Sequence, residues 1–113
     1  MPTADELYDE ADKLKDAGKL DEAVAKFQEI LAVEPNHALA HSALAVVYIR
    51  LKKPNEAIQH AQKVCEIEPN DAFSFTALSV TFQRAFTITN NHQFIQLAED
   101  AMARARILQG GHH

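Results

Sequence analysis

Residues 19–36, KLDEAVAKFQEILAVEPN, decide the fold, because they recur 34 positions later as residues 53–70, KPNEAIQHAQKVCEIEPN. Both stretches end on Glu-Pro-Asn and share Lys, Glu, Ala and Gln at matched positions. Where they differ, apolar residues replace apolar residues at several positions: Val24/Ile58, Ile30/Val64 and Val33/Ile67. Self-similarity at a period of about 20–50 residues predicts a stack of repeated supersecondary units.

The same offset divides the chain into three units, which cover residues 4–37, 38–71 and 72–112. Each unit has the pattern of a helical hairpin. In the first unit, Leu7, Ala11 and Leu14 have the i, i+4, i+7 spacing of one buried helix face. Gly18 predicts the end of that helix. A second apolar helix face follows, formed by Ala23, Phe27, Ile30 and Leu31.

Polar residues at the helix ends support this division. Thr3 with Glu6 three residues later has the pattern of a capping box, which satisfies free N–H groups at a helix start. Pro35 predicts the end of the second helix, because its ring disfavours helical backbone in the preceding residue. We expect Asn36, and Asn70 one repeat later, to cap the helices that follow.

The third unit is longer than the other two. The alanine found at 23 and 57 should recur at 91 but stands at Ala98, so seven extra residues separate the two helices. An added turn in each helix would absorb them, and a flexible insertion around residues 87–91 is the alternative. Asn90 or Asn91 is the expected cap of the last helix, whose predicted core stripe is Phe94, Ala98, Ala101, Ala105 and Leu108.

Composition narrows the class of protein. The chain has 113 residues, of which 47% are hydrophobic and 24% charged, as in a soluble protein of one domain. Its longest apolar run, residues 43–49, is far shorter than the roughly 20 residues of a membrane-spanning helix. The acidic N-terminus lacks the apolar segment of a secretory signal. The single cysteine, Cys65, excludes an internal disulfide and fits a reducing compartment. We therefore expect one cytoplasmic domain over residues 1–113, without membrane insertion.

Charge is distributed unevenly. Residues 1–36 hold ten acidic and four basic residues, whereas the other 77 hold six acidic and seven basic residues. The bases form no stripe and are not interleaved with aromatic residues, so nucleic acid is not an expected partner. The acidic segment either attracts basic partners or is a solvated helix face. The terminal Gly110–His113 segment is either native or the remnant of a purification tag, and no functional inference is based on it.

This pattern resembles the tetratricopeptide repeat (TPR) family over nearly the whole chain. In that family, small residues at two positions of each repeat let the two helices approach closely. The matching pairs here are Ala11/Ala23, Ala45/Ala57 and Ser79/Ala98. Pro35 and Pro69 match the prolines near the repeat end, and Tyr48 and Phe82 match a family aromatic, which Leu14 replaces in the first unit. The usual Trp is absent. The resemblance implies an all-α fold, a right-handed superhelical stack of about three helix-turn-helix hairpins.

The resemblance also implies a concave groove lined by the first helix of each hairpin. Nine residues at its inward-facing positions are candidate partner contacts: Tyr8, Asp12, Leu39, Val46, Ile49, Arg50, Phe73, Val80 and Arg84. The implied groove has an acidic rim at one end and an apolar floor, which suits a peptide or helix with hydrophobic anchors. Arg50 and Arg84 could receive a carboxylate. The leading hypothesis is a non-catalytic protein-interaction module; alternatively, part of the floor is buried between adjacent hairpins.

One function within the family is not expected. TPR domains that clamp the tails of Hsp70 and Hsp90 chaperones use Lys, Asn and Arg at five positions. This sequence carries other residues there: Tyr8, Asp12, Ala43, Phe73 and Ala77. None of these can hold a terminal carboxylate in the same way, so a chaperone-tail receptor is disfavoured.

Three further hypotheses complete the set. The last helix could present Ile95, Met102 and Ile107 to a second copy, making a self-assembling structural protein or homodimer. Alternatively, the lengthened third hairpin is the cap of the stack and the chain stays monomeric. His37 and His41 have the i, i+4 spacing of a metal pair, but no acid or cysteine nearby completes the site, so neither metal nor cofactor is expected. The sequence has no nucleophile–base order and no Gly-rich phosphate loop, and Cys65 occupies a packed helix position. An enzyme is therefore not expected.

Overall fold

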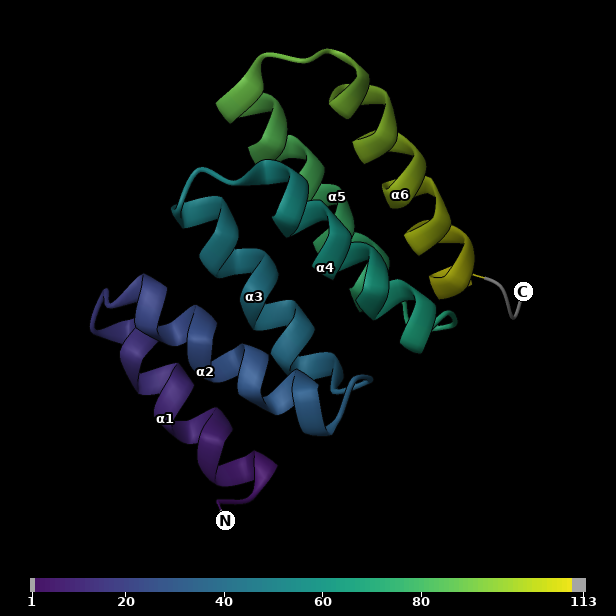
Figure 1. The fold of residues 1–113 in the computed structure, drawn as a ribbon. Coiled ribbons are helices and arrows are strands. Elements are labelled where there is room, and N and C mark those ends of the chain that lie inside the picture. Colours follow the sequence, from purple (N-terminus) through teal and green to yellow (C-terminus); the bar gives the residue numbers. More distant parts are fainter. Residues whose placement is uncertain (1, 111–113) are drawn as a thin grey trace.

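The computed structural model describes residues 2–110, and these form six helices without any strand. The helices pair in chain order as three hairpins: α1 (Ala4–Asp16) with α2 (Leu20–Val33), α3 (Ala38–Arg50) with α4 (Pro54–Ile67), and α5 (Ala72–Thr89) with α6 (Gln93–Gly110). Figure 1 shows the hairpins in a row, from α1 at the N-terminal end to α6 at the C-terminal end. The expected all-α helical repeat is confirmed. The last two residues of the predicted third unit, and most of the Gly110–His113 segment, lie outside the described range.

The first two hairpins close through the same backbone motif. Gly18, at a φ of +78°, follows α1; its N–H donates to the Lys15 carbonyl, and the Lys19 N–H donates to the Leu14 carbonyl. This pair of bonds is a Schellman motif, which satisfies the free carbonyls of a helix end. Lys52 repeats it after α3 at a φ of +62°. The predicted helix end at Gly18 is therefore confirmed.

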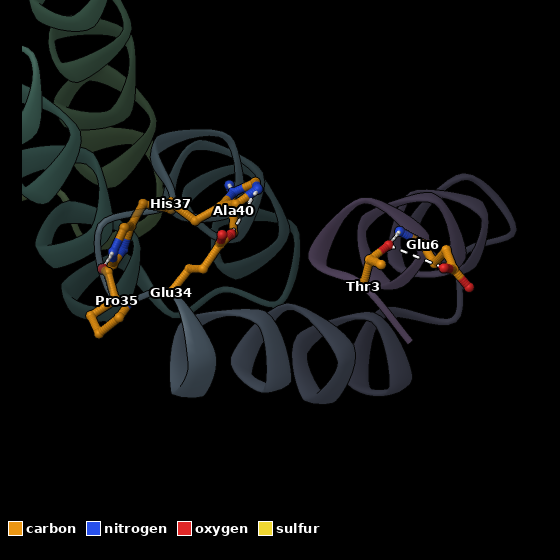
Figure 2. A network of polar contacts seen from close by, with 7 residues as sticks. Thr3, Glu6, Glu34, Pro35, His37 and Ala40 are labelled. Atoms are coloured by element: carbon orange, nitrogen blue, oxygen red, sulfur yellow. Dashed lines mark hydrogen bonds and ion pairs between the residues drawn. The ribbon is translucent and has the colours of Figure 1, made fainter. Parts of the chain in front are cut away.

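The predicted cap of α1 is confirmed, whereas the predicted caps of α3 and α5 are wrong. The Thr3 hydroxyl accepts a hydrogen bond from the Glu6 N–H at 3.1 Å, as the capping box predicts (Figure 2). The expected caps Asn36 and Asn70 are wrong, because each Glu-Pro-Asn tripeptide forms a β-turn whose fourth residue becomes the cap. His37 Nδ1 accepts from the Ala40 N–H at 3.1 Å (Figure 2), and the Asp71 carboxylate accepts from the Phe73 N–H at 2.9 Å.

Two apolar clusters join each hairpin to the next. In the first, Phe27 and Ile30 of α2 pack with Leu44 and Val47 of α3, and all four side chains are fully buried. Burial of a side chain of this size contributes roughly 1.5–3 kcal/mol. In the second, Leu78, Phe82 and Ala85 of α5 pack against residues of α3 and α4, together with Ala98 and Ala101 of α6. Because each cluster spans two hairpins, neighbouring hairpins stabilise one another.

The third hairpin places its extra residues in helices. Helices α5 and α6 are each 18 residues long, whereas α1 to α4 have 13 or 14 residues. Only residues 90–92 connect the two long helices, so the flexible insertion considered from the sequence is not formed. Asn90 ends α5 in left-handed backbone at a φ of +59°, and the Asn91 side chain accepts from the Gln93 N–H at 3.0 Å.

The stack is flat and elongated, with principal extents of 45 × 35 × 20 Å. Helix α5 packs on α4 and also touches α3, as α3 does on α2 and α1. This offset between hairpins leaves the first helices side by side on one face of the slab. Within residues 2–110, no helix combines the length and apolar character that crossing a membrane requires.

Candidate functional site: a groove between α3 and α5

One open pocket of about 560 Å³ lies between α3 and α5, with α4 behind it. Its rim carries four large apolar side chains that remain exposed: Leu39 at 62%, Val46 at 53%, Phe73 at 85% and Val80 at 40%. These are four of the eight large apolar side chains that the described part of the chain leaves exposed. We call this pocket and its four-residue rim the α3–α5 groove.

Helical periodicity explains why these four residues face the groove. Leu39 and Val46 are seven residues apart in α3, and Phe73 and Val80 are seven apart in α5, so each pair lies on one helix face. A different face of α3 carries Ala40, Leu44 and Val47, which pack into the core. Helix α3 therefore carries apolar residues beyond its buried faces, and Leu39 and Val46 stay exposed.

Small residues keep the groove open. Ala38 and Ala45 of α3, Ala61 of α4 and Ala77 of α5 line its walls. These alanines were not predicted as site residues, because the inward-facing positions of the repeat do not include them. The signal that could have identified them is the run of small residues on facing sides of α3, α4 and α5, which leaves space that larger side chains would fill.

Polar groups mark one end of the groove. Glu68 and Asp71, which flank the turn between α4 and α5, belong to its lining. Asp71 is already engaged as the cap of α5, whereas Glu68 is exposed at the end of α4. The hydroxyl of Thr81 donates to the Ala77 carbonyl within α5 at 3.0 Å. The groove is therefore an apolar surface with a negative end.

The other five predicted contact residues do not line this groove. Tyr8 is half-buried and packs edge-on against Phe27, with ring centroids 5.6 Å apart. Asp12 pairs with Lys15 at 3.0 Å, and the Arg50 guanidinium donates to the Lys15 carbonyl at 3.3 Å. Ile49 is half-buried near the C-terminal end of α3, and Arg84 is exposed in α5. The groove thus brings together four apolar residues of the predicted set, and contact with a partner remains a prediction for all nine.

The two histidines considered as a metal pair make different contacts. His37 caps α3, whereas His41 lies in the hairpin interior, with its Nδ1 2.9 Å from His60 Nδ1 and its Nε2 2.8 Å from the Pro35 carbonyl oxygen. The His60 ring also stacks on Tyr48, with centroids 5.6 Å apart. Burial, and then the neighbouring His41, lower the pKa of His60. This cluster ties α3 to α4 and to the turn before α3.

The single cysteine is held in a thiol form. Cys65 is buried, and its Sγ donates to the Ser74 carbonyl at 3.4 Å across the α4–α5 contact. Burial, and then the charge of Asp71, raise the pKa of Cys65 to about 11. Because the thiolate is the nucleophilic form, a thiol in this environment is unreactive.

Three stacked helical hairpins define an α-helical repeat protein, and the groove lies between the first helices of its second and third hairpins. The sequence model of the tetratricopeptide repeat family matches residues 8–72. The chain therefore belongs to the tetratricopeptide repeat family. A stretch of 62 residues is 36% identical to the TPR repeat-containing thioredoxin TDX of Oryza sativa subsp. japonica; it covers 49% of this chain and 20% of that protein. The chain thus spans only about a fifth of this curated relative.

Solved structures support the fold over almost the full chain. The second TPR of Spaghetti (RPAP3), bound to the HSP90 peptide SRMEEVD, is similar with a TM-score of 0.74 and 15% identity, covering 93% of this chain and 91% of that one. The structure of MamA from Desulfovibrio magneticus RS-1 gives a TM-score of 0.62 and 18% identity, covering 96% and 77%. At these identities the likeness shows the fold alone.

Proposed function

We propose that this chain is a non-catalytic protein-interaction module that binds a segment of a partner protein in the α3–α5 groove. The observation that carries this proposal is the gathering of half of the exposed large apolar side chains around one pocket. Such a concentration on a soluble protein marks an interaction site. The unreactive Cys65 thiol supports a binding role over a redox role, and a reduced compartment such as the cytoplasm suits that free thiol.

The spacing of the rim residues suggests the form of the partner segment. Two residues seven apart in a helix lie about 10 Å apart along its axis. A partner could match this spacing with apolar anchors three residues apart in an extended segment, or seven apart in a helix. The anchors would fill the pocket, and the surrounding backbone would remain at the rim, as in other groove-binding peptides.

The groove suits a different peptide from the acidic one bound by the Spaghetti domains. The five positions that family members use to hold a chaperone tail carry Tyr8, Asp12, Ala43, Phe73 and Ala77 in this chain. Ala43 is buried, and Asp12 carries the same charge as such a tail. The negative end of the groove likewise disfavours acidic segments, so we expect neutral or basic residues beside the apolar anchors.

Selection from a displayed library of random peptides tests this proposal. We expect selected peptides to carry at least two apolar anchors. Their affinity for the Val46→Glu/Val80→Glu variant should be at least tenfold lower, because the bound peptide would bury two carboxylates against those anchors. Val33→Glu is the control, since Val33 is 72% exposed at the end of α2 and does not line the groove. Fluorescence anisotropy measures the affinities, and equal affinity for the groove variant would refute the proposal.

A further inference from the structure

The contact between the second and third hairpins defines a docking surface that recurs in the fold. Helix α5 packs on α4, where Ile58, Ala61 and Cys65 form one stripe, and on Ala45 of α3. The stripe residues have i, i+3, i+7 spacing and therefore lie on one face of α4. This stripe is buried only because α5, the next helix in the chain, covers it.

The third hairpin presents the same surface without a covering helix. The repeat offset of 34 places Ser79 of α5 at the position of Ala45. The offset of 41 that aligns Ala57 with Ala98 places Glu99, Met102 and Arg106 of α6 at the positions of Ile58, Ala61 and Cys65. All four residues line one groove of about 960 Å³ between α5 and α6. We call the α6 stripe formed by Ile95, Glu99, Met102, Ala103 and Arg106 the α6 face.

The opposite end of the stack cannot cover the α6 face of another copy. The α3 residues that pack on α2 include Ala40, Leu44 and Val47, and the offset of 34 matches them to Glu6, Glu10 and Lys13 in α1. These three α1 residues are exposed, and Glu10 pairs with Lys26 at 3.3 Å. A head-to-tail contact through α1 would bury these charged residues, including the Glu10–Lys26 pair, where the second hairpin offers apolar ones, so an open chain of copies is disfavoured.

We propose that the α6 face docks against the same face of a second copy, with the two α6 helices antiparallel about a two-fold axis. In this antiparallel pairing, a residue of one α6 helix faces a residue of the other α6 helix when their two residue numbers add to 205. Glu99 then meets Arg106 of the second copy twice, and Met102 and Ala103 lie at the axis. Neither Glu99 nor Arg106 takes part in the ion pairs found within residues 2–110, so both charges are free to pair across the interface.

The apolar residues of the α6 face fit this arrangement, and Asp100, which also lines the groove, accepts a hydrogen bond from the Gln96 amide at 2.9 Å and faces Ala105 of the second copy. Ile95 is 40% exposed and lines the groove, and Met102 is half-buried between α5 and α6. The second α6 helix would cover these apolar groups as α5 covers Ala61 and Cys65. Ile107, which the sequence grouped with them, is 59% exposed but does not line the groove. The α3–α5 groove shares no lining residue with this surface, so a dimer would present two open grooves.

Charge reversals test the proposed symmetry. Sedimentation velocity of the full chain at about 100 μM should detect a dimer of micromolar affinity. Glu99→Arg alone and Arg106→Glu alone should each be monomeric, because each places like charges opposite one another twice. An equimolar mixture of the two variants should dimerise, since both contacts are then complementary, and the double variant should dimerise by itself.

Controls separate this interface from other surfaces and from misfolding. Both positions are exposed, so circular dichroism should show unchanged helicity in each variant. Arg104→Glu makes the same charge change on another side of α6, where Arg104 lies over the Phe75 ring, and should leave the dimer intact. A wild-type chain that stays monomeric at this concentration would overturn the proposal. A dimer that survives either single reversal, or a mixture that fails to associate, would also overturn it.

Discussion

Lysine occupies a backbone conformation at position 52 that glycine occupies at position 18. Both residues end the first helix of a hairpin with a positive φ, +62° for Lys52 and +78° for Gly18. A side chain bearing a Cβ atom is strained in this conformation, whereas glycine is not. The second hairpin therefore closes at a cost in free energy that the first hairpin avoids.

Exchanging these residue types should change stability in opposite directions. Lys52→Gly should raise the free energy of unfolding by about 0.5–1 kcal/mol, because it removes the strain. Gly18→Ala should lower it by about 1 kcal/mol; a Cβ atom there would meet no neighbour within 4 Å, so the loss is conformational. Urea denaturation measures both changes, and a Lys52→Gly variant less stable than the wild type would contradict this account.

The His41–His60 contact makes stability depend on pH. The Pro35 carbonyl can only accept, so His41 donates from Nε2 and accepts at Nδ1, and His60 donates from Nδ1. Because the pKa of His60 is lowered in the folded chain, the unfolded chain binds a proton there more readily. The stabilising contribution is complete above the ordinary pKa of about 6.5 and is lost as the pH falls through the lower, folded-state pKa.

Acidification should therefore destabilise the wild type more than a His60→Gln variant. Thermal or urea unfolding between about pH 7.5 and 5 measures the free energy of unfolding of each protein. Comparing the slopes of this free energy against pH for the two proteins removes the contribution of the other titrating groups. Parallel slopes for the two proteins would show that His60 does not couple folding to pH.

At the scale of the helix, close approach depends on small residues inside each hairpin. Ala11, Ala23 and Ala57 are fully buried, and in the third hairpin the Ser79 hydroxyl donates to the Ala98 carbonyl at 2.8 Å. A larger side chain at these positions would force the two helices apart. The small residues therefore set a short distance between the two helices of each hairpin.

Substitution by leucine at a buried and at an exposed alanine of α2 tests this requirement. Ala23→Leu should lower the free energy of unfolding by about 1–3 kcal/mol through overpacking. Ala25→Leu is the matched control, since Ala25 is exposed in the same helix and leucine is also a good helix former. Equal stability of the two variants in chemical denaturation would show that the hairpin tolerates a wider helix spacing.

The helices were predictable where a periodic signal repeats, and the errors lie where local turn chemistry decides. The 34-residue offset, the apolar stripes and Gly18 identified the hairpins because each signal reflects burial or a required backbone conformation. Asn36 and Asn70 were assigned as caps because asparagine favours that position, but the β-turns that begin at Glu34 and Glu68 place the cap one residue further along. The 34-residue offset aligns Lys52 with Gly18, but a lysine gives no sequence signal of the left-handed backbone that it adopts there.

At the scale of the whole molecule, the two ends of the stack differ in chemistry. The outer face of α1 is charged, whereas α6 presents apolar residues between two opposite charges. The position of each repeat residue predicted that Leu39, Val46, Phe73 and Val80 would lie on the inner face. It did not predict that only these four of the nine would surround one pocket, because that depends on the alanines of three helices and on how the hairpins are offset.

The central claim is that the α3–α5 groove receives a partner segment, and a nitrogen-15 NMR titration with a library-selected peptide tests it most directly. We predict that the largest shift changes occur at residues of α3 and α5 around Val46 and Val80, with little change at Val33 and along the α6 face. Saturable binding whose shift changes fall outside the groove would contradict the claim.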